Sequence, residues 1–346
     1  MTIPLRAAVR FLASRVHGRA TALLVAGVLA GCTTPNASPI ASASTSPSPS
    51  ITSTPVATTA TPSPSPSLVA DPGRILFTEF QGSGLAFTVY TMNPDGSDRK
   101  TVITGRNAVP RWSPDGRHIA VSTSQVDPTY FETVMNADGT DVHDLIRPDP
   151  TLSLSCTAWS PDNALLACEG WDDTKLGREG VYTVRASDGG DLKRITTSTG
   201  GIHDIPGDFT PDGTEIVFVR ASYPPGSVGQ LWMARVDGTN TRKLVDTLIG
   251  YRVSLTRDGT RIAGSLNGQL VILDLQNISA PPRQIAIPKG LAVTPRWSPD
   301  GTRLVFVLAR SDGTRQVHVV NADVTNERQL TSDARRDEYP DWGPST

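Results

Sequence analysis

The chain has 346 residues, of which 38% are hydrophobic and 19% are charged, and its formal net charge is −2. The first 31 residues contain four arginines and no acidic residue, so their removal would leave a charge of about −6. This acidic balance argues against nucleic acid or an anionic surface as the partner.

The first 31 residues have the features of an export signal. An apolar run from 20 to 30, too short to span a bilayer as a mature helix, ends in Leu29-Ala30-Gly31-Cys32. Its basic flank consists of Arg6, Arg10, Arg15 and Arg19. The ending resembles the bacterial lipobox, which implies that Cys32 receives a diacylglyceryl thioether and becomes the mature N-terminus. Such lipid chains would anchor the protein to a membrane. The alternative is an ordinary secretory peptide that ends near a cysteine.

Residues 32–70 are predicted to form a disordered tether. They are almost wholly Thr, Ser, Pro and Ala, as in Ser44-Thr45-Ser46-Pro47-Ser48-Pro49-Ser50. This composition buries too little apolar surface to offset the entropy of ordering, and it favours polyproline II. As a coil the segment would reach roughly 35 Å, and at most about 120 Å when fully extended. It would hold a domain away from a membrane surface.

Residues 71–346 form a repeat array. Each repeat has an apolar anchor followed by a turn, as in Trp112-Ser113-Pro114-Asp115-Gly116. Pro, Asp and Gly in this order favour the tight turn of a β-hairpin. The other anchors are Trp159, Phe209, Leu255, Trp297 and Trp342, at intervals of 42 to 50 residues. A second hairpin motif, such as Asn93-Pro94-Asp95-Gly96, lies between successive anchors. This period is typical of four strands per propeller blade.

The order of the strands predicts how the ring closes. In the first complete repeat the anchor strand at Trp112 is innermost, and three more strands follow it at 119–122, 133–136 and 144–146. The N-terminal end of the array lacks an anchor strand and offers only 75–78, 87–92 and 100–104. The segment 339–342 supplies the missing strand, so the two ends should complete one blade. Closure would remove exposed edges, and we expect a monomer.

The alternation of Trp-Ser-Pro-Asp-Gly and Met-Asn-x-Asp-Gly hairpins resembles the TolB family over residues 71–346. The resemblance implies an all-β, six-bladed β-propeller, here in a membrane lipoprotein with the propeller on the extracytoplasmic side. The protein departs from the pattern at the Leu255 anchor, where Thr256-Arg257 replaces Ser-Pro, and at Gln276-Asn277, which replaces the second Asp-Gly. No segment matches the separate N-terminal domain that precedes the propeller in TolB.

The cysteines and histidines do not suggest a metal or a cofactor. Cys156 and Cys168 flank the hairpin of Trp159 and should lie opposite each other, which predicts a disulfide in an exported protein. The alternative is two buried thiols. The sequence has no C-x-x-C and no H-E-x-x-H, and the histidines of the array, His118, His143, His203 and His318, are scattered.

The sequence favours a binding or scaffold protein over an enzyme. It contains no G-x-S-x-G, and we expect no hydrolase domain after the array. The repeated aspartates are explained by turn formation and the tryptophans by packing between blades. The expected partner is a cell-envelope protein or a polar ligand. The alternative is a carbohydrate-active or other hydrolase or lyase that uses the central funnel.

The predicted binding residues precede the anchors by three to six positions. They differ between repeats, whereas the turns repeat, and they should enter the innermost strands at one mouth of the central channel. The alternative is that they are solvated loop residues at a polar funnel. The set comprises Arg106, Asn107, His203, Asp204, Tyr251, Arg252, Arg336, Asp337 and Glu338.

Overall fold

The computed structural model of the protein describes residues 73–81, 86–106, 109–124, 130–222, 228–250, 252–332 and 335–344. The predicted signal, the tether and the lipidation site Cys32 lie outside these residues. Within these ranges, no helix is long and apolar enough to cross a membrane.

Four sheets have four strands each, and successive strands in a sheet are antiparallel. The first contains β4 (Val109–Trp112), β5 (His118–Ser124), β6 (Tyr130–Asn136) and β7 (His143–Asp144). The second contains β8 (Ser153–Trp159), β9 (Leu165–Trp171), β10 (Gly180–Arg185) and β11 (Lys193–Arg194). The third contains β12 (Ile202–Phe209), β13 (Glu215–Ser222), β14 (Val228–Arg235) and β15 (Arg242–Gly250). The fourth contains β16 (Ser254–Leu255), β17 (Arg261–Leu266), β18 (Gln269–Asp274) and β19 (Arg283–Ile285).

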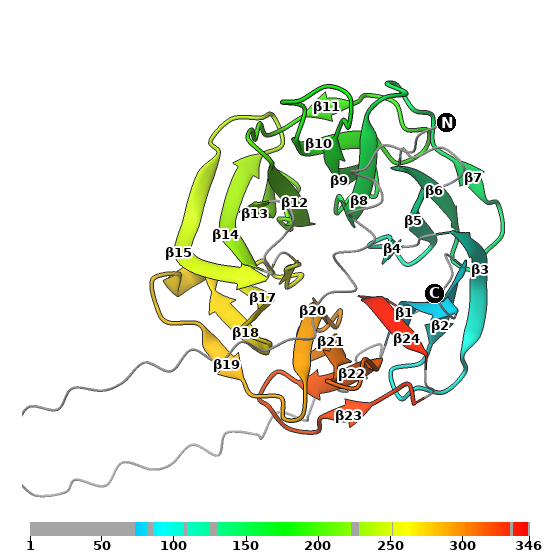
Figure 1. Cartoon of the computed structure of the whole chain (residues 1–346), viewed down its shortest axis with the longest axis vertical. Coiled ribbons are helices and arrows are strands. Elements are labelled where there is room, and N and C mark those ends of the chain that lie inside the picture. Colours follow the sequence, from blue (N-terminus) through cyan, green and yellow to red (C-terminus); the bar gives the residue numbers. More distant parts are fainter. Residues whose placement is uncertain are drawn as a thin grey trace, which may run out of the picture. The chain divides into compact units, whose positions relative to one another are not determined.

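An eight-stranded sheet contains both ends of the described residues. Its C-terminal strands are β20 (Leu291–Trp297), β21 (Arg303–Ala309), β22 (Arg315–Asn321), β23 (Arg328–Gln329) and β24 (Arg336–Gly343). Its N-terminal strands are β1 (Arg74–Gln81), β2 (Ala86–Met92) and β3 (Lys100–Arg106). β24 pairs antiparallel with β1, with Ile75 opposite Trp342, and Figure 1 shows these strands side by side. Between β22 and β24, Arg315 and Arg336 are the only described residues that pair.

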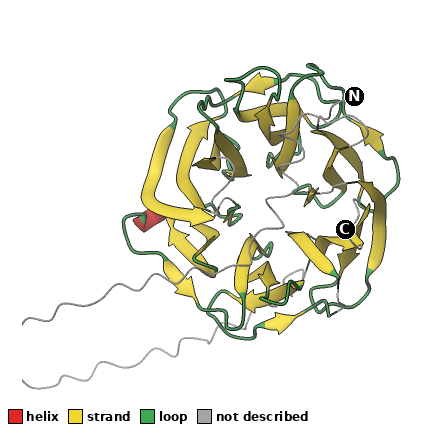
Figure 2. Ribbon diagram, viewed as in Figure 1, coloured by secondary structure: helices red, strands yellow, loops and turns green. Residues whose placement is uncertain are grey.

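The sheets surround a common centre, and the anchor strands lie on the inner side (Figures 1 and 2). This is an all-β propeller fold. The described elements are strands apart from one 3-10 turn, η2 (Leu275–Asn277). The anchor strands β4, β8, β12 and β16 each form one edge of their sheet, as the repeat pattern predicts.

Each anchor turn is closed by its own side chains. In the turn after Trp112, Gly116 N donates to Ser113 O (2.9 Å) and has a φ of +74°, a conformation that glycine adopts without strain. Asp115 Oδ1 accepts from the Ser113 hydroxyl (2.6 Å) and from Arg117 N (3.0 Å). Equivalent bonds occur at the other four turn aspartates, Asp162, Asp212, Asp258 and Asp300. These carboxylates therefore form turns, as predicted.

The core lies between neighbouring sheets, so the strands are apolar on both faces. In β1, Ile75 and Phe77 pack with Trp342 in one cluster, while Leu76 packs with Trp112 in another. Because side chains alternate along a strand, one strand contributes to two interfaces. A Cβ at Gly343 would lie 2.2 Å from Trp112 Cγ, so only glycine allows this close approach.

Three other anchor tryptophans contact a basic side chain from the preceding repeat. The His118 and Trp159 rings stack with their centroids 6.4 Å apart. The contacts for the later anchors are Arg261 over Trp297 at 4.8 Å and Arg303 over Trp342 at 4.7 Å. These tryptophans therefore pack between repeats, which agrees with the sequence-based interpretation.

Cys156 and Cys168 face each other on β8 and β9 and form a disulfide. A buried carboxyl group lies beside this bridge: Glu132 accepts from the Ser122 hydroxyl (2.8 Å) and from Cys156 N (3.3 Å). No ion pair to Glu132 occurs among the described residues. Burial raises the pKa of Glu132 well above its ordinary value, although the Ser122 bond opposes the shift.

We expect Trp342→Ala to lower the free energy of unfolding by about 3–5 kcal/mol, because it empties a buried site where β24 meets β1. Deleting 339–346 should destabilise the protein further, because residues 74–76 of β1 then lose their partners on β24. Denaturant unfolding measures both effects. Ile146→Ala, at a residue that is 69% exposed, is the control. If the deletion variant unfolds like the parent, β24 does not hold the ring together.

We expect Glu132→Gln to stabilise the protein at neutral pH and to have little effect below pH 4.5, the ordinary pKa of glutamate. A carboxyl pKa that is raised on folding contributes stability below the unfolded pKa and loses it as pH rises through the folded pKa. Glutamine removes this loss because it does not ionise. Thermal melts across pH, with the exposed Asp173→Asn as control, measure the difference. Identical pH profiles for variant and parent would contradict the assignment.

Candidate functional site

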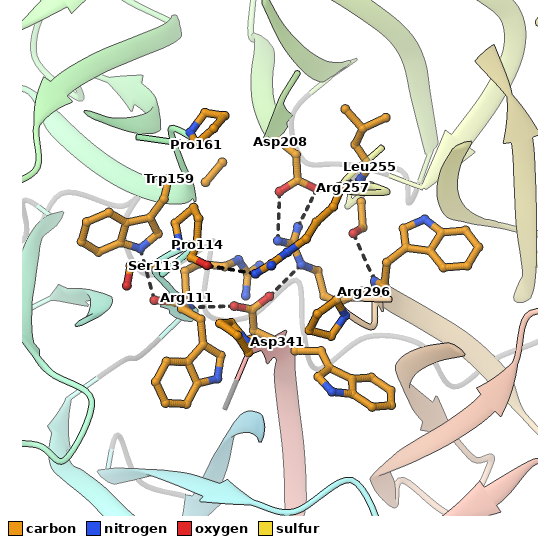
Figure 3. Close-up of a pocket in the computed structure, with 18 of the residues that line it drawn as sticks. Arg111, Ser113, Pro114, Trp159, Pro161, Asp208, Leu255, Arg257, Arg296 and Asp341 are labelled. Atoms are coloured by element: carbon orange, nitrogen blue, oxygen red, sulfur yellow. Dashed lines mark hydrogen bonds and ion pairs between the residues drawn. The ribbon is translucent and has the colours of Figure 1, made fainter. Parts of the chain in front are cut away.

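A cavity of about 410 Å³ lies where the anchor strands end and their turns begin. This volume is within the range of small-molecule and cofactor pockets. Its walls include the six anchors Trp112, Trp159, Phe209, Leu255, Trp297 and Trp342. Figure 3 shows the polar groups that converge at its centre. The cavity therefore combines apolar walls with a charged interior.

The residue directly before each anchor also lines the cavity. These six residues are Arg111, Ala158, Asp208, Ser254, Arg296 and Asp341. The alternation of side chains along a strand explains the pattern, because an anchor that packs between sheets turns its predecessor away from that interface. The sequence contained this signal at a constant spacing, but the sequence-based prediction selected positions further upstream.

Arg296 links two carboxylates across the cavity. Arg296 Nη2 lies 2.9 Å from Asp208 Oδ1, and Arg296 Nε lies 2.8 Å from Asp341 Oδ1. The second oxygens are also occupied: Asp341 Oδ2 accepts from Trp112 N and Asp208 Oδ2 from Leu255 N, both at 2.7 Å. This series of charge-assisted bonds joins β4, β24, β20, β12 and β16.

Burial and ion pairing oppose each other in this series of bonds. Burial alone would lower the pKa of Arg296, but the charges and hydrogen bonds of Asp208 and Asp341 outweigh it and raise that pKa. Burial raises the pKa of Asp208 against the opposing effect of Arg296. Removal of Arg296 would therefore leave two buried carboxylates without their ion-pair partner.

Arg111 is a buried cation at the same site. It is 4% exposed, and it donates from Nε to Thr157 O (3.0 Å) and from Nη1 to Pro110 O (2.8 Å). No carboxylate pairs with Arg111 among the residues that the structure describes. Burial, followed by the charge of Arg296, lowers the pKa of Arg111 to about 9. Arg111 therefore brings a positive charge that the protein does not balance by direct contact.

The residue two positions after each anchor lies at the rim of the cavity. Five turns place a proline there, namely Pro114, Pro161, Pro211, Pro299 and Pro344. The sixth position is Arg257, one of the departures noted in the sequence. The Arg257 side chain extends across the cavity, and its Nη2 donates to Pro114 O (3.0 Å), as Figure 3 shows. The exposed arginine thus spans the mouth.

None of the predicted binding residues that the structure describes lines this cavity. Asn107 and Tyr251 lie outside the described residues. Arg106 was expected on an innermost strand, but this expectation is wrong because Arg106 ends β3, the outermost strand, and pairs with Ala86. The other six lie on β12, on β24 or just before β16, upstream of the residues that line the cavity.

Most of these upstream residues form polar contacts within the protein. His203 Nδ1 lies 2.7 Å from Glu169 Oε1, and Asp204 forms an ion pair with Arg220 (2.7 Å). Glu338 is buried and accepts from Arg336 Nε (2.7 Å) and Arg315 Nη2 (3.0 Å). Asp337 is buried beside them.

Arg252 differs from the other predicted residues in its polar contacts. Its Nε and Nη1 atoms are buried and meet no acceptor among the described residues. Its guanidinium lies 5.4 Å from the centre of the Tyr339 ring. The charge of Arg252 also contributes to lowering the pKa of Arg111. Arg252 therefore adds to the positive charge around the centre.

Within the ranges that the structure describes, no group of three or more His, Cys, Asp or Glu side chains could hold a metal ion.

Comparison with known proteins identifies one family. The family described as the TolB beta propeller domain matches residues 51–263. Comparison with curated protein sequences gives no significant match.

Several solved structures share the fold. TolB from Acinetobacter baumannii has 22% sequence identity and a TM-score of 0.65, over 79% of this chain and 67% of that chain. A putative TolB from Agrobacterium tumefaciens has 17% identity and a TM-score of 0.58, over 76% and 92%. A protein of a nidogen/laminin complex has 12% identity and a TM-score of 0.58, over 78% and 97%.

We expect Arg296→Met to destabilise the protein by about 3–5 kcal/mol at neutral pH, because it leaves Asp208 and Asp341 buried without their ion-pair partner. The deficit should shrink at acidic pH, where Asp208, whose pKa is raised by burial, takes up a proton. Denaturant unfolding at several pH values measures the effect. Adding Asp208→Asn and Asp341→Asn to the variant should recover part of the loss. A variant as stable as the parent would show that the bridge is dispensable.

Proposed function

Because the protein belongs to the TolB β-propeller family, we propose that it is a binding or scaffold protein that captures a partner at the central cavity. The cavity carries this proposal, since it joins apolar walls to a few fixed polar groups, the usual character of a ligand pocket. Its partner would be a cell-envelope protein or a polar ligand.

We further propose that the ring has six blades. The eight-stranded sheet then counts as two blades, because one residue pair between β22 and β24 is much less than the pairing within a blade. In this count one blade consists of β24, β1, β2 and β3, and the pairing of β24 with β1 closes the ring. Six anchors at a regular interval support the same number.

The state of the carboxylates favours binding over catalysis. Asp208 and Asp341 are each held by Arg296 and by a backbone N–H group. A general acid or base must exchange protons with a substrate. Carboxylates that are fixed in this way are better suited to shaping a pocket than to glycoside cleavage, so we rank the hydrolase or lyase alternative second.

The proposal also includes attachment to the outer face of a membrane. TolB-like proteins are proteins of the cell envelope, and the lipobox-like ending at Cys32 with the tether behind it suits a lipoprotein. The tether would allow the propeller to reach a partner at some distance from the membrane.

We expect Cys32→Ala to release the protein from the membrane fraction, because the variant cannot carry the thioether-linked lipid. Fractionation and the mass of the N-terminal peptide measure the effect. An unchanged distribution, together with a parent peptide of unmodified mass, would contradict lipidation.

Partner capture is tested by crosslinking in envelope preparations, followed by mass spectrometry. We expect the double variant Pro161→Arg, Pro211→Arg to lose at least about 10-fold of the captured partner, because long side chains then cover the rim. Its melting temperature should hardly change, since both prolines are exposed and arginine already occupies the same turn position at 257.

The matched control changes three of the residues that the sequence pattern selected upstream of the anchors. The triple variant His203→Ala, Tyr251→Ala, Arg336→Ala should retain capture if the cavity is the site. If the triple variant loses capture and the double variant does not, the binding site lies at the upstream residues that the sequence analysis predicted. A panel of polysaccharide and peptide substrates, incubated with the purified protein, tests the enzyme alternative in parallel.

A further inference from the structure

We infer that the central cavity binds the carboxylate of a peptide between Arg111 in its interior and Arg257 across its mouth. This inference rests on the proposed function, because it names the chemistry of the captured partner. The charges of the cavity and the apolar character of its walls both support it.

The aspartates that line the cavity are already engaged. Asp115 accepts from Ser113 and from Arg117 N within its own turn. Asp208 and Asp341 share Arg296. The lining has three arginines and three aspartates. Of the arginines, only Arg111 and Arg257 form no direct ion pair among the described residues, so their N–H groups can still meet a carboxylate.

Both arginines donate to neutral acceptors. Arg111 donates to the Thr157 and Pro110 carbonyl oxygens, and Arg257 donates to the Pro114 carbonyl oxygen. A carboxylate is a stronger acceptor than a carbonyl group for a guanidinium. An entering carboxylate would therefore compete well for Arg257, whose side chain is exposed. It would also give the buried Arg111 a carboxylate in direct contact, which the described residues do not provide.

The walls favour a peptide as the carrier of this carboxylate. Four indole rings, Phe209 and the rim prolines provide apolar surface around the charged centre. A bare inorganic anion would leave this surface without contact, whereas a short peptide would cover it. The carboxylate could come from the C-terminus of the peptide or from an Asp or Glu side chain, and the experiment separates these sources.

The test incubates the full-length protein with three tetrapeptide libraries at equal concentration and measures the retained fraction by mass spectrometry. The first library has free C-termini and no acidic residue. The second has amidated C-termini and one Asp or Glu. The third is amidated and contains no acidic residue. We expect retention of the first or the second library above the third by about 10- to 100-fold, as for a charge-assisted hydrogen bond.

Substitutions at Arg257 then locate the contact. Arg257→Pro restores the residue of the other five turns, and the Arg257 N–H donates to no described backbone acceptor, so the variant should fold. We expect it to reduce the preference for the retained carboxylate-bearing library about 10-fold, whereas Arg257→Lys keeps part of it. Arg111→Gln should abolish the preference, and its melting temperature reports whether it folds.

The outcomes separate the inference from the proposed function. Equal retention of all three libraries, or none of any, overturns the carboxylate inference. If the Pro161 and Pro211 double variant still reduces partner capture in that case, the proposed function stands without the carboxylate inference. A preference for carboxylate-bearing peptides that survives in both Arg257→Pro and folded Arg111→Gln would also overturn the inference. Loss of the preference only in the arginine variants supports it.

Discussion

The bridge of Arg296 to Asp208 and Asp341 is the interaction on which the centre of the ring depends. A propeller brings many strands to one axis, where few apolar side chains can fill the space and charged groups lose water. The protein meets this constraint by giving both carboxylates the same guanidinium and one backbone N–H group each. Strands far apart in the sequence are held by charge where they cannot be held by sheet pairing.

The repeat made much of the fold predictable. The turn residues have strong local preferences, so Pro114, Asp115 and Gly116 and their copies marked the hairpins, and the spacing of the anchors indicated the number of strands in each unit. The pairing of the two ends was predicted because the N-terminal repeat lacks an anchor strand and the C-terminal segment consists of one. The outermost strands were less predictable: β7 covers only His143–Asp144, because an edge strand with exposed side chains has little apolar pattern.

The candidate site was less accessible to sequence reasoning. Variation between repeats drew attention to His203, Asp204 and Glu338, but these side chains mainly form polar contacts with neighbouring strands, and such contacts vary as readily as ligand contacts. The cavity residues stand directly before the anchors, where an arginine at one repeat meets an aspartate two repeats away. No local pattern reveals a pairing across the ring. Arg257 was visible as a departure from the turn motif, but only its contact with Pro114 gave it a role.

The pairing of β24 with β1 also has a consequence for the order of folding. Ile75 and Trp342 pair although they lie near opposite ends of the array, so this contact closes the largest loop in the domain. Because the polypeptide is synthesised from its N-terminus, the edge of β1 stays unpaired until β24, the last strand, is available. The earlier sheets are built from local hairpins and can form before that moment. Completion of the ring should therefore be the slow step, and the unpaired edge of β1 is the part of the new polypeptide most in need of protection from other molecules.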